Sequence, residues 1–499
     1  MNISRLVKKL RDDYKFLLMT LLLTSTQVWA TQNPINQDID PLITPRLTLT
    51  ACHLGEIKSQ VRCGKLQVPE NYQQPDSQKI TINFAILPAI DNSDNKTPLL
   101  FLAGGPGQAA VELSTMINRV FREVRKTRDI ILIDQRGTGQ SRPLSCDFDE
   151  PENIYSLLTK DFKVSDVTQC ISQFEGDLSQ FTTENAIRDF DQVRSALGYN
   201  KINIYGGSYG TRAGLVYMRM FPESLESAVL DSVGPIEVPI GLFGQSGARA
   251  FNLLIESCKS NQSCHQAFPN LVAEFQQVKN YLAKEPVTLD IQHPRLGTSV
   301  KFILDKDKFT SNLRMQLYSV NGRSLVPLVI HQAFLGNYQP LIGLMASTEG
   351  EQKVYTGLYF NIVCNEDLPK ISPQMQAIDA NNNFDGGSTH FAFNTICPLF
   401  PQYRLSDNFY QSVTTTIPTL ILSGNLDPVT PPSNGEYSAN TLPNSHHIIV
   451  EYAAHVVAMS TCASDIINEF LTSKKPNQLD ESCLKDIPQE TFMTSVNGI

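Results

Sequence analysis

The stretch that most constrains the fold is residues 202–212, with the sequence INIYGGSYGTR. It predicts a short strand at 202–205, a tight turn through Ser208 and a helix directly after it. Glycines stand two residues before and two residues after the serine, at Gly206 and Gly210. We interpret this pattern as an elbow in which the serine takes strained backbone angles and a Cβ at either glycine would clash with a neighbouring strand or helix. A plain glycine turn is the alternative, and the flanking strand and helix disfavour it.

Further strands and helices alternate around this elbow. A continuous apolar run at 99–102 predicts a strand that is buried on both faces, and residues 129–133 predict the next buried strand. Residues 180–198 predict a helix with a core-facing apolar side, and 227–230 predict another strand. This alternation predicts an α/β fold with a mostly parallel central sheet and right-handed crossovers. Residues 79–87 alternate in polarity and predict an outer antiparallel strand.

The pattern changes after the strand at 227–230. Between residues 236 and 415 buried-strand runs largely disappear, and helical segments and irregular polar stretches take their place. We interpret residues 236–415 as a largely helical lid inserted over the carboxyl edge of the sheet. Strands at 419–422 and 447–450 resume the sheet. The predicted core is therefore residues 31–235 and 416–499.

The first 30 residues predict a targeting segment, a signal peptide. Five basic residues precede or border an apolar run at 16–23, and Val28 and Ala30 are the small residues expected at a cleavage site. The apolar run is shorter than the roughly 20 residues that a membrane span needs, which disfavours an uncleaved anchor. We therefore expect a secreted or periplasmic protein with no stable membrane anchor after cleavage.

Ten cysteines in an exported chain predict disulfides. Zinc binding is the alternative, and it is disfavoured because the sequence has no C-x2-C unit and no histidine pair at ligand spacing beside the cysteines. The net charge of −9, without a basic cluster beyond the amino terminus, argues against nucleic-acid binding. We expect each cysteine to pair with its nearest neighbour in the sequence, as Cys52–Cys63, Cys146–Cys170, Cys258–Cys264, Cys364–Cys397 and Cys462–Cys483.

The ends of the predicted strands supply residues for nucleophilic catalysis. A serine hydroxyl is a weak nucleophile until a base takes its proton, and the base needs a carboxylate to fix its tautomer. Ser208 is followed in the chain by Asp427 and His455, which both lie just beyond strand ends on the same sheet edge. Asp427 is preferred to Asp407 or Asp465 because, of these three, it alone terminates a buried strand. The order serine, aspartate, histidine is the order of the α/β-hydrolase fold, and we predict these residues as the catalytic triad.

Backbone N–H groups beside the serine predict an oxyanion hole. The glycine cluster at 103–107 ends a buried strand and leaves N–H groups uncovered. We expect the donors to be the N–H of Tyr209 and one from Gly104 or Gly105. A simple strand-to-helix turn is the alternative, whereas a phosphate loop is disfavoured because no Gly-Lys-Ser/Thr follows.

The strand at 129–133 leads into a dense polar segment at 134–141. Polar groups packed this closely are costly to bury unless they bond one another. We interpret the segment as a structural brace near the site, and we expect Asp134 to form a salt bridge with a nearby arginine.

Four motifs together resemble the proline iminopeptidase and tripeptidyl aminopeptidase group of α/β-hydrolases, with a C-terminal region of the TAP-like type. The resemblance covers about residues 97–235 and 417–460. It implies an exported serine exopeptidase that removes residues from the amino termini of peptides, with no metal and no cofactor. Ala103 stands where the iminopeptidases of this group usually have histidine, so prolyl specificity is not implied. The motifs are Gly104-Gly105-Pro106-Gly107, Asp134-Gln135-Arg136-Gly137-x-Gly139-x-Ser141, Gly206-Gly207-Ser208-Tyr209-Gly210 and Gly424-x-x-Asp427-Pro428-Val429-Thr430-Pro431.

An aminopeptidase needs carboxylates that recognise a positive amino terminus. The lid segment Val363-Cys364-Asn365-Glu366-Asp367 resembles the Cys-x-Glu/Asp segment of the tripeptidyl group. This makes Glu366, with Asp367, the candidate substrate anchor. The alternative is a solvated acidic pair beside a disulfide.

Two other functions use the same scaffold. A carboxylic ester hydrolase of the esterase or lipase type has the same machinery, with an apolar lid face and no amine anchor. A non-enzymatic binding protein on a hydrolase scaffold is the second, and an intact serine, acid and base argue against it.

Overall fold

The computed structural model describes residues 47–499, apart from positions 92, 94–95, 147–163, 293–298, 349–352, 388–392, 496 and 498–499. The predicted signal peptide at 1–30 lies outside the described residues. Within the described part of the chain, no helix combines the length and the apolar character needed to span a bilayer.

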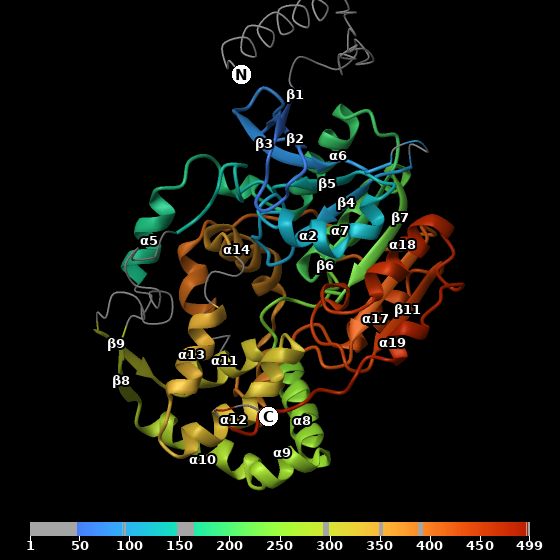
Figure 1. Ribbon diagram of the computed structural model, residues 1–499. Helices are drawn as coiled ribbons and strands as arrows, with labels where there is room; N and C mark the ends of the chain where they lie inside the picture. The colour runs from blue at the N-terminus through green and yellow to red at the C-terminus, as the bar shows by residue number, and fades with distance from the viewer. Residues whose placement is uncertain are drawn as a thin grey trace, which may run out of the picture. The chain divides into compact units, whose positions relative to one another are not determined.

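A nine-stranded sheet organises the described part of the chain, in the order β1-β2-β3-β5-β4-β6-β7-β10-β11 (Figure 1). The strands from β5 to β11 in this order pair in parallel, whereas β1, β2 and β3 extend one side of the sheet as antiparallel strands. The predicted mostly parallel α/β sheet is therefore confirmed. The strands are β1 (Leu47–Cys52), β2 (Val61–Pro69), β3 (Lys79–Leu87), β4 (Leu99–Leu102), β5 (Ile130–Ile133), β6 (Ile202–Gly207), β7 (Leu225–Asp231), β10 (Thr419–Gly424) and β11 (Ser445–Val450).

The antiparallel side of the sheet is larger than the sequence predicts. Strand β3 was expected at the outside, but β2 pairs along its whole length and β1 pairs beyond β2. The register of β1 on β2 sets Cys52 opposite Val61 and Thr50 opposite Cys63, and the disulfide Cys52–Cys63 joins the two strands. Strands β1 and β2 mix polar and apolar residues, as is typical of strands near a sheet edge, so the sequence shows no continuous apolar run at either strand.

Helices cover both faces of the sheet. Alternate residues of the buried strands enter two different apolar clusters: Leu100 and Ile131 join one, and Leu99 and Ile130 join the other. Helix α6 follows the predicted spacing and packs in the first cluster through Phe190. The helices of the core are α2 (Ser114–Val120), α3 (Arg122–Arg125), α5 (Val164–Ser172), α6 (Thr183–Ala196), α7 (Tyr209–Met220), α17 (Pro432–Ala439), α18 (Ala463–Ser473) and α19 (Ser482–Lys485).

The segment between β7 and β10 has its own apolar core, built around Phe251, Phe275 and Phe309. It is largely helical, and it also contains an antiparallel hairpin of β8 (Val287–Gln292) and β9 (Ser299–Leu304), which the sequence did not predict. We refer to residues 236–415 as the lid. Its helices are α8 (Gly244–Ser260), α9 (Gln262–Ala267), α10 (Leu271–Lys284), α11 (Lys306–Gln316), α12 (Val320–Phe334), α13 (Gln339–Thr348), α14 (Thr356–Ile362) and α15 (Pro373–Ala380).

All ten cysteines form disulfides, and they pair as predicted. Each bridge joins residues that lie between 6 and 33 positions apart in the sequence. The bridges therefore fasten local segments of the core and of the lid.

Candidate active site

Ser208 stands at the turn between β6 and α7 in a strained backbone conformation. Its φ is 56° and its ψ is −125°, a region that non-glycine residues rarely adopt. A Cβ on Gly206 would overlap the carbonyl oxygen of Gly210, and a Cβ on Gly210 would overlap the carbonyl oxygen of Leu102 in β4. Both glycines are therefore required by close approach of the backbone, as the sequence predicted.

Asp427 and His455, which are 28 residues apart, meet beyond the ends of β10 and β11. His455 Nδ1 lies 2.7 Å from Asp427 Oδ2. The other carboxylate oxygen of Asp427 accepts the backbone N–H groups of Val429 and Thr430, at 2.8 and 2.9 Å. The hydroxyl of Thr430 donates to Asp427 Oδ2 at 2.8 Å, so the carboxylate is held in one orientation.

Burial and charge compete at this pair. Burial alone would raise the pKa of Asp427, but the charge and the hydrogen bond of His455 hold that pKa below its usual range. Burial alone would lower the pKa of His455, and the charge of Asp427 raises it above its usual range. The pair therefore favours an ionised carboxylate beside an imidazole that readily accepts a proton.

The loop that carries His455 packs against the serine turn. A Cβ added to Gly207 would lie 3.5 Å from Cγ1 of Val456, the residue after the histidine. No hydrogen bond joins Ser208 Oγ to the imidazole among the residues that the structure describes. Catalytic hydrogen bonds are often long in a protein without substrate and tighten when substrate binds.

The predicted oxyanion donors lie beside the serine. A Cβ on Gly104 would come within 3.4 Å of the Cβ of Ser208, which places this loop next to the elbow. The N–H of Gly104 donates to Gln108 Oε1 at 3.1 Å. Within the described residues, no acceptor is found for the N–H of Tyr209 or of Gly105, so these two groups can turn to an oxyanion.

The polar segment after β5 is a brace, but its bonds differ from the prediction. Asp134 accepts hydrogen bonds from Asn83 Nδ2 and from the N–H groups of Val111 and Gln140, not from an arginine. Arg136 instead forms a fully buried pair with Asp189, with two contacts of 2.7 Å. The expected salt bridge of Asp134 was wrong because backbone and amide donors fill its acceptor sites.

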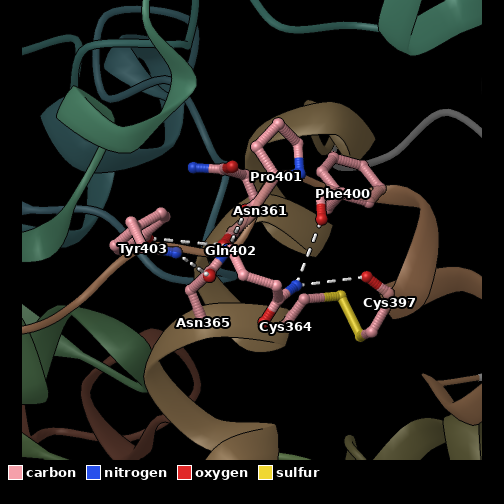
Figure 2. The surroundings of a disulfide bond; sticks show 8 residues. All are labelled: Asn361, Cys364, Asn365, Cys397, Phe400, Pro401, Gln402 and Tyr403. Carbon is pink, nitrogen blue, oxygen red and sulfur yellow. Dashed lines mark hydrogen bonds between the residues drawn. A yellow bond between two sulfur atoms is a disulfide. The ribbon is translucent and has the colours of Figure 1, made fainter.

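The candidate substrate anchor lies on a π-helical turn, Val363–Asp367, in the lid. Its middle is fixed by the Cys364–Cys397 disulfide and by Asn365, whose side chain bonds to Pro401 and Tyr403 (Figure 2). Glu366 is 1% exposed, so the solvated pair considered as the alternative is excluded.

Both acids make contacts with the core. Glu366 accepts the N–H of Thr183 at 2.8 Å and its hydroxyl at 2.5 Å. Asp367 Oδ1 accepts from Arg212 Nη1 at 2.6 Å and from the N–H of Ile240. Asp367 Oδ2 is buried without a hydrogen-bond partner in the described structure. The role of this pair as an anchor stays a prediction.

Sequence reasoning missed two groups that contact the histidine loop. The carbonyl of Tyr318, in the lid, accepts the N–H of His455 at 3.2 Å, and its ring lies edge-on to the imidazole at 5.0 Å. Asp231 is the last residue of β7, a position similar to that of Asp427 after β10. The carboxylate of Asp231 accepts the N–H groups of Val457 and Ala458. The position of Asp231 at the end of a buried strand was a visible signal in the sequence, whereas the contact of Tyr318 depends on how the lid folds.

No group of three or more histidine, cysteine, aspartate or glutamate side chains placed to hold an ion occurs within the described residues.

Comparisons with known proteins agree with this architecture. A family model described as the alpha/beta hydrolase fold matches residues 97–277, and one described as a TAP-like protein matches residues 388–483. The chain is 30% identical over 226 residues to the serine protease Hip1 of Mycobacterium tuberculosis, covering 40% of this chain and 42% of that protein. It is 30% identical over 196 residues to the tripeptidyl aminopeptidase of Streptomyces lividans, covering 35% of each.

A third relative is the proline iminopeptidase of Aeromonas sobria, which is 28% identical over 227 residues, covering 44% of this chain and 48% of that protein. The chain therefore spans less than half the length of the curated relatives that it matches.

Proposed function

Since this chain is an α/β-hydrolase with a TAP-like C-terminal region, we propose that it is an exported serine hydrolase that releases residues or short peptides from the amino termini of peptides. The proposal rests on one observation above the others. The buried pair of Asp427 and His455, 2.7 Å apart, stands at the sheet edge where Ser208 occupies its strained turn.

Each of these residues has a role in the proposed mechanism. Ser208 Oγ attacks the scissile carbonyl carbon while His455 Nε2 takes its proton, and Asp427 holds the Nδ1 proton and stabilises the imidazolium. The N–H groups of Tyr209 and Gly105 stabilise the oxyanion. The imidazolium then protonates the departing amine, and water hydrolyses the acyl-enzyme on Ser208 by the same route.

The relatives favour a peptide substrate with a free amino terminus. One of them is named a tripeptidyl aminopeptidase and another a proline iminopeptidase, and an enzyme that acts at a free amino terminus needs an anionic anchor. Of the predicted pair, Asp367 has the unused acceptor, because both oxygens of Glu366 bond to Thr183. We therefore place the substrate amine nearer to Asp367, reached by local movement of the π-helical turn.

The test uses a fluorophosphonate probe and two substrate classes. We expect the probe to attach to Ser208 and Ser208→Ala to abolish both labelling and turnover while the fold is kept. A second serine–histidine pair, Ser423 Oγ and His447 Nε2 at 2.9 Å, is an internal control, because Ser423 is fully buried and should stay unlabelled. Turnover by Ser208→Ala, or an adduct elsewhere, would contradict the proposal.

Ester hydrolysis is the second candidate, because the lid carries clustered aromatic rings and both acids are buried. The rings of Tyr359 and Phe360 lie 5.3 Å apart, and Phe360 packs near Phe393 and Phe400. Aminoacyl and peptidyl arylamides should be cleaved faster than short-chain nitrophenyl esters if the enzyme is an aminopeptidase. Asp367→Asn also removes the countercharge of the buried Arg212, so it is compared at equal folded fraction. It should then raise KM for free-amine peptides more than for amino-blocked esters, whereas equal effects would favour the esterase.

Export is supported by the predicted signal peptide and by five disulfides, which persist in oxidising compartments. Sequencing the amino terminus of the protein recovered from its producing cells tests this. We expect the mature chain to begin at Thr31, and an uncleaved Met1 would contradict export by this route.

A further inference from the structure

The end of strand β7 contacts both the serine turn and the histidine loop. The backbone carbonyl of Asp231 accepts the N–H of Ser208 at 3.0 Å. Its carboxylate accepts two consecutive N–H groups of the histidine loop, those of Val457 at 2.8 Å and of Ala458 at 2.9 Å. The next hydroxyl, Ser232 Oγ, accepts the N–H of Val456 at 2.8 Å.

These bonds hold a loop that is strained. Val456 has φ 59° and ψ 85°, and a left-handed conformation is a clear outlier for a β-branched residue. Ser232 is also left-handed, with φ 61°. Such conformations persist only where the surroundings over-determine them. Because His455 directly precedes Val456, the bonds to Asp231 and Ser232 fix where the imidazole projects.

The Asp231 carboxylate also acts on the imidazole through its charge. It is fully buried and accepts the hydroxyl of Tyr205 at 2.8 Å. Burial raises the pKa of Asp231 to about 6, and its charge acts together with that of Asp427 to raise the pKa of His455. Asp427, the hydroxyl of Thr430 and the ring of Tyr318 contact the imidazole of His455, and Asp231 acts on it through its charge.

We infer that Asp231 and Ser232 are positioning residues, which hold the general base His455 in register with the nucleophile Ser208. The inference rests on the proposed function, because it concerns the same serine and histidine. The two residues have different parts. Asp231 orients the loop and supplies charge, whereas Ser232 orients the loop alone.

The two parts can be separated by the rate and the pH dependence of fluorophosphonate labelling. Labelling needs neutral His455 and is lost as the pH falls through the pKa of that residue. Asp231→Asn keeps the shape of the side chain but removes a charge that raises the pKa of His455. We expect the labelling rate to fall by about tenfold to a hundredfold. We also expect the acid limb, the fall in labelling rate on the acid side of the pH profile, to move to lower pH. Ser232→Ala should slow labelling to a similar degree with the acid limb in place.

Asp129→Asn is the matched control. Asp129 is also a buried carboxylate that accepts a backbone N–H group, that of Ala89, but it directly precedes β5 and so lies at the amino ends of the parallel strands, away from the histidine loop. We expect it to lower the melting temperature and to leave the labelling rate and acid limb as in the wild type.

Wild-type labelling is measured first, and its absence would contradict the proposed function itself. If the wild type is labelled, an unchanged rate in Ser232→Ala together with an unchanged acid limb in Asp231→Asn overturns the positioning role alone. If Asp231→Asn fails to fold, an unchanged rate in Ser232→Ala still overturns it, and a slowed rate supports it.

Discussion

Glu366 shows how much one buried side chain determines at this site. It belongs to the lid, yet both of its oxygens bond to Thr183 at the start of α6 in the core. The hydroxyl of Thr183 in turn contacts the hydroxyl of Tyr209, the residue after the nucleophile, at 2.7 Å. A change at Glu366 is therefore transmitted by hydrogen bonds to the elbow as well as to the lid.

Glu366 should make stability fall as the pH rises. Burial raises the pKa of Glu366 from 4.5 to about 7. The folded chain therefore keeps a proton that the unfolded chain loses above pH 4.5. Its contribution to the free energy of unfolding is complete below that pH and declines by on the order of 3 kcal/mol up to about pH 7. Thermal unfolding of the wild type and of Glu366→Gln from pH 4 to 8 measures this decline.

The glutamine variant should show a flatter profile across that range. Its amide can keep both bonds, with Oε1 accepting the N–H of Thr183 and Nε2 donating to the hydroxyl. A matched control is Glu256→Gln, whose side chain is 70% exposed and which should follow the wild-type profile. Parallel profiles for the wild type and Glu366→Gln would contradict the prediction.

The candidate catalytic residues could be predicted from the sequence because each has a local signal. Ser208 lies between glycines at a strand end, and Asp427 and His455 follow the last two strands. Asp231 has a similar local signal at the end of a buried strand, but that signal does not assign its role, and Tyr318 has no such signal. Their contacts with the histidine loop depend on the register of neighbouring strands and on the packing of the lid. Strand register and lid packing cannot be predicted from a short stretch of sequence.

At the scale of the elements, buried strands were predicted well and edge elements poorly. Strands β4 and β5 are continuous apolar runs, as expected for strands buried inside a parallel sheet. Strand β1 alternates leucine and threonine beside polar residues, and its pairing with β2 across the Cys52–Cys63 bridge is what makes it a strand. The hairpin of β8 and β9 is likewise stabilised by tertiary contacts, through Phe302 in the apolar core of the lid.

The disulfide at the π-helical turn should contribute more to the free energy of unfolding than the short bridge between α8 and α9. Cys364 and Cys397 are 33 residues apart, and on the chain-entropy account their removal costs about 4 kcal/mol. Cys258 and Cys264 are 6 residues apart, and their removal costs about 2 kcal/mol on the same account. Replacing each pair by serine and measuring unfolding in urea tests the difference.

The two serine variants should also differ in activity. The Cys364–Cys397 bridge fixes the turn that carries Glu366 and Asp367 (Figure 2), so its loss should raise KM for free-amine peptides. The short bridge joins α8 to α9 and serves as the control. Equal losses of stability in the two variants would contradict the dependence on loop length. Equal changes in KM would contradict a specific role of the Cys364–Cys397 bridge in positioning the turn.

At the scale of the whole chain, the C-terminal tail ties the catalytic core to the lid. After α19, which the Cys462–Cys483 disulfide fastens to the start of α18, the chain runs to helices α8 and α12 (Figure 1). Glu490 forms a bidentate pair with Arg323, at 2.7 and 3.0 Å, and both side chains are at most 2% exposed. Phe492 packs in the apolar core of the lid. The lid is therefore completed by residues that follow the last strand of the sheet.

Breaking this pair should destabilise the lid more than the core. Glu490→Gln leaves the guanidinium of Arg323 buried without its countercharge, which costs about 3 kcal/mol or more. We expect a lower unfolding midpoint and new protease cleavage sites within residues 236–415. The control is Asp407→Asn in the exposed pair with Arg404, where the side chains are 85% and 86% exposed and the same change should have no measurable effect. Equal effects of the two variants would contradict the prediction, because they would mean that burial of the pair is not what holds the tail in the lid.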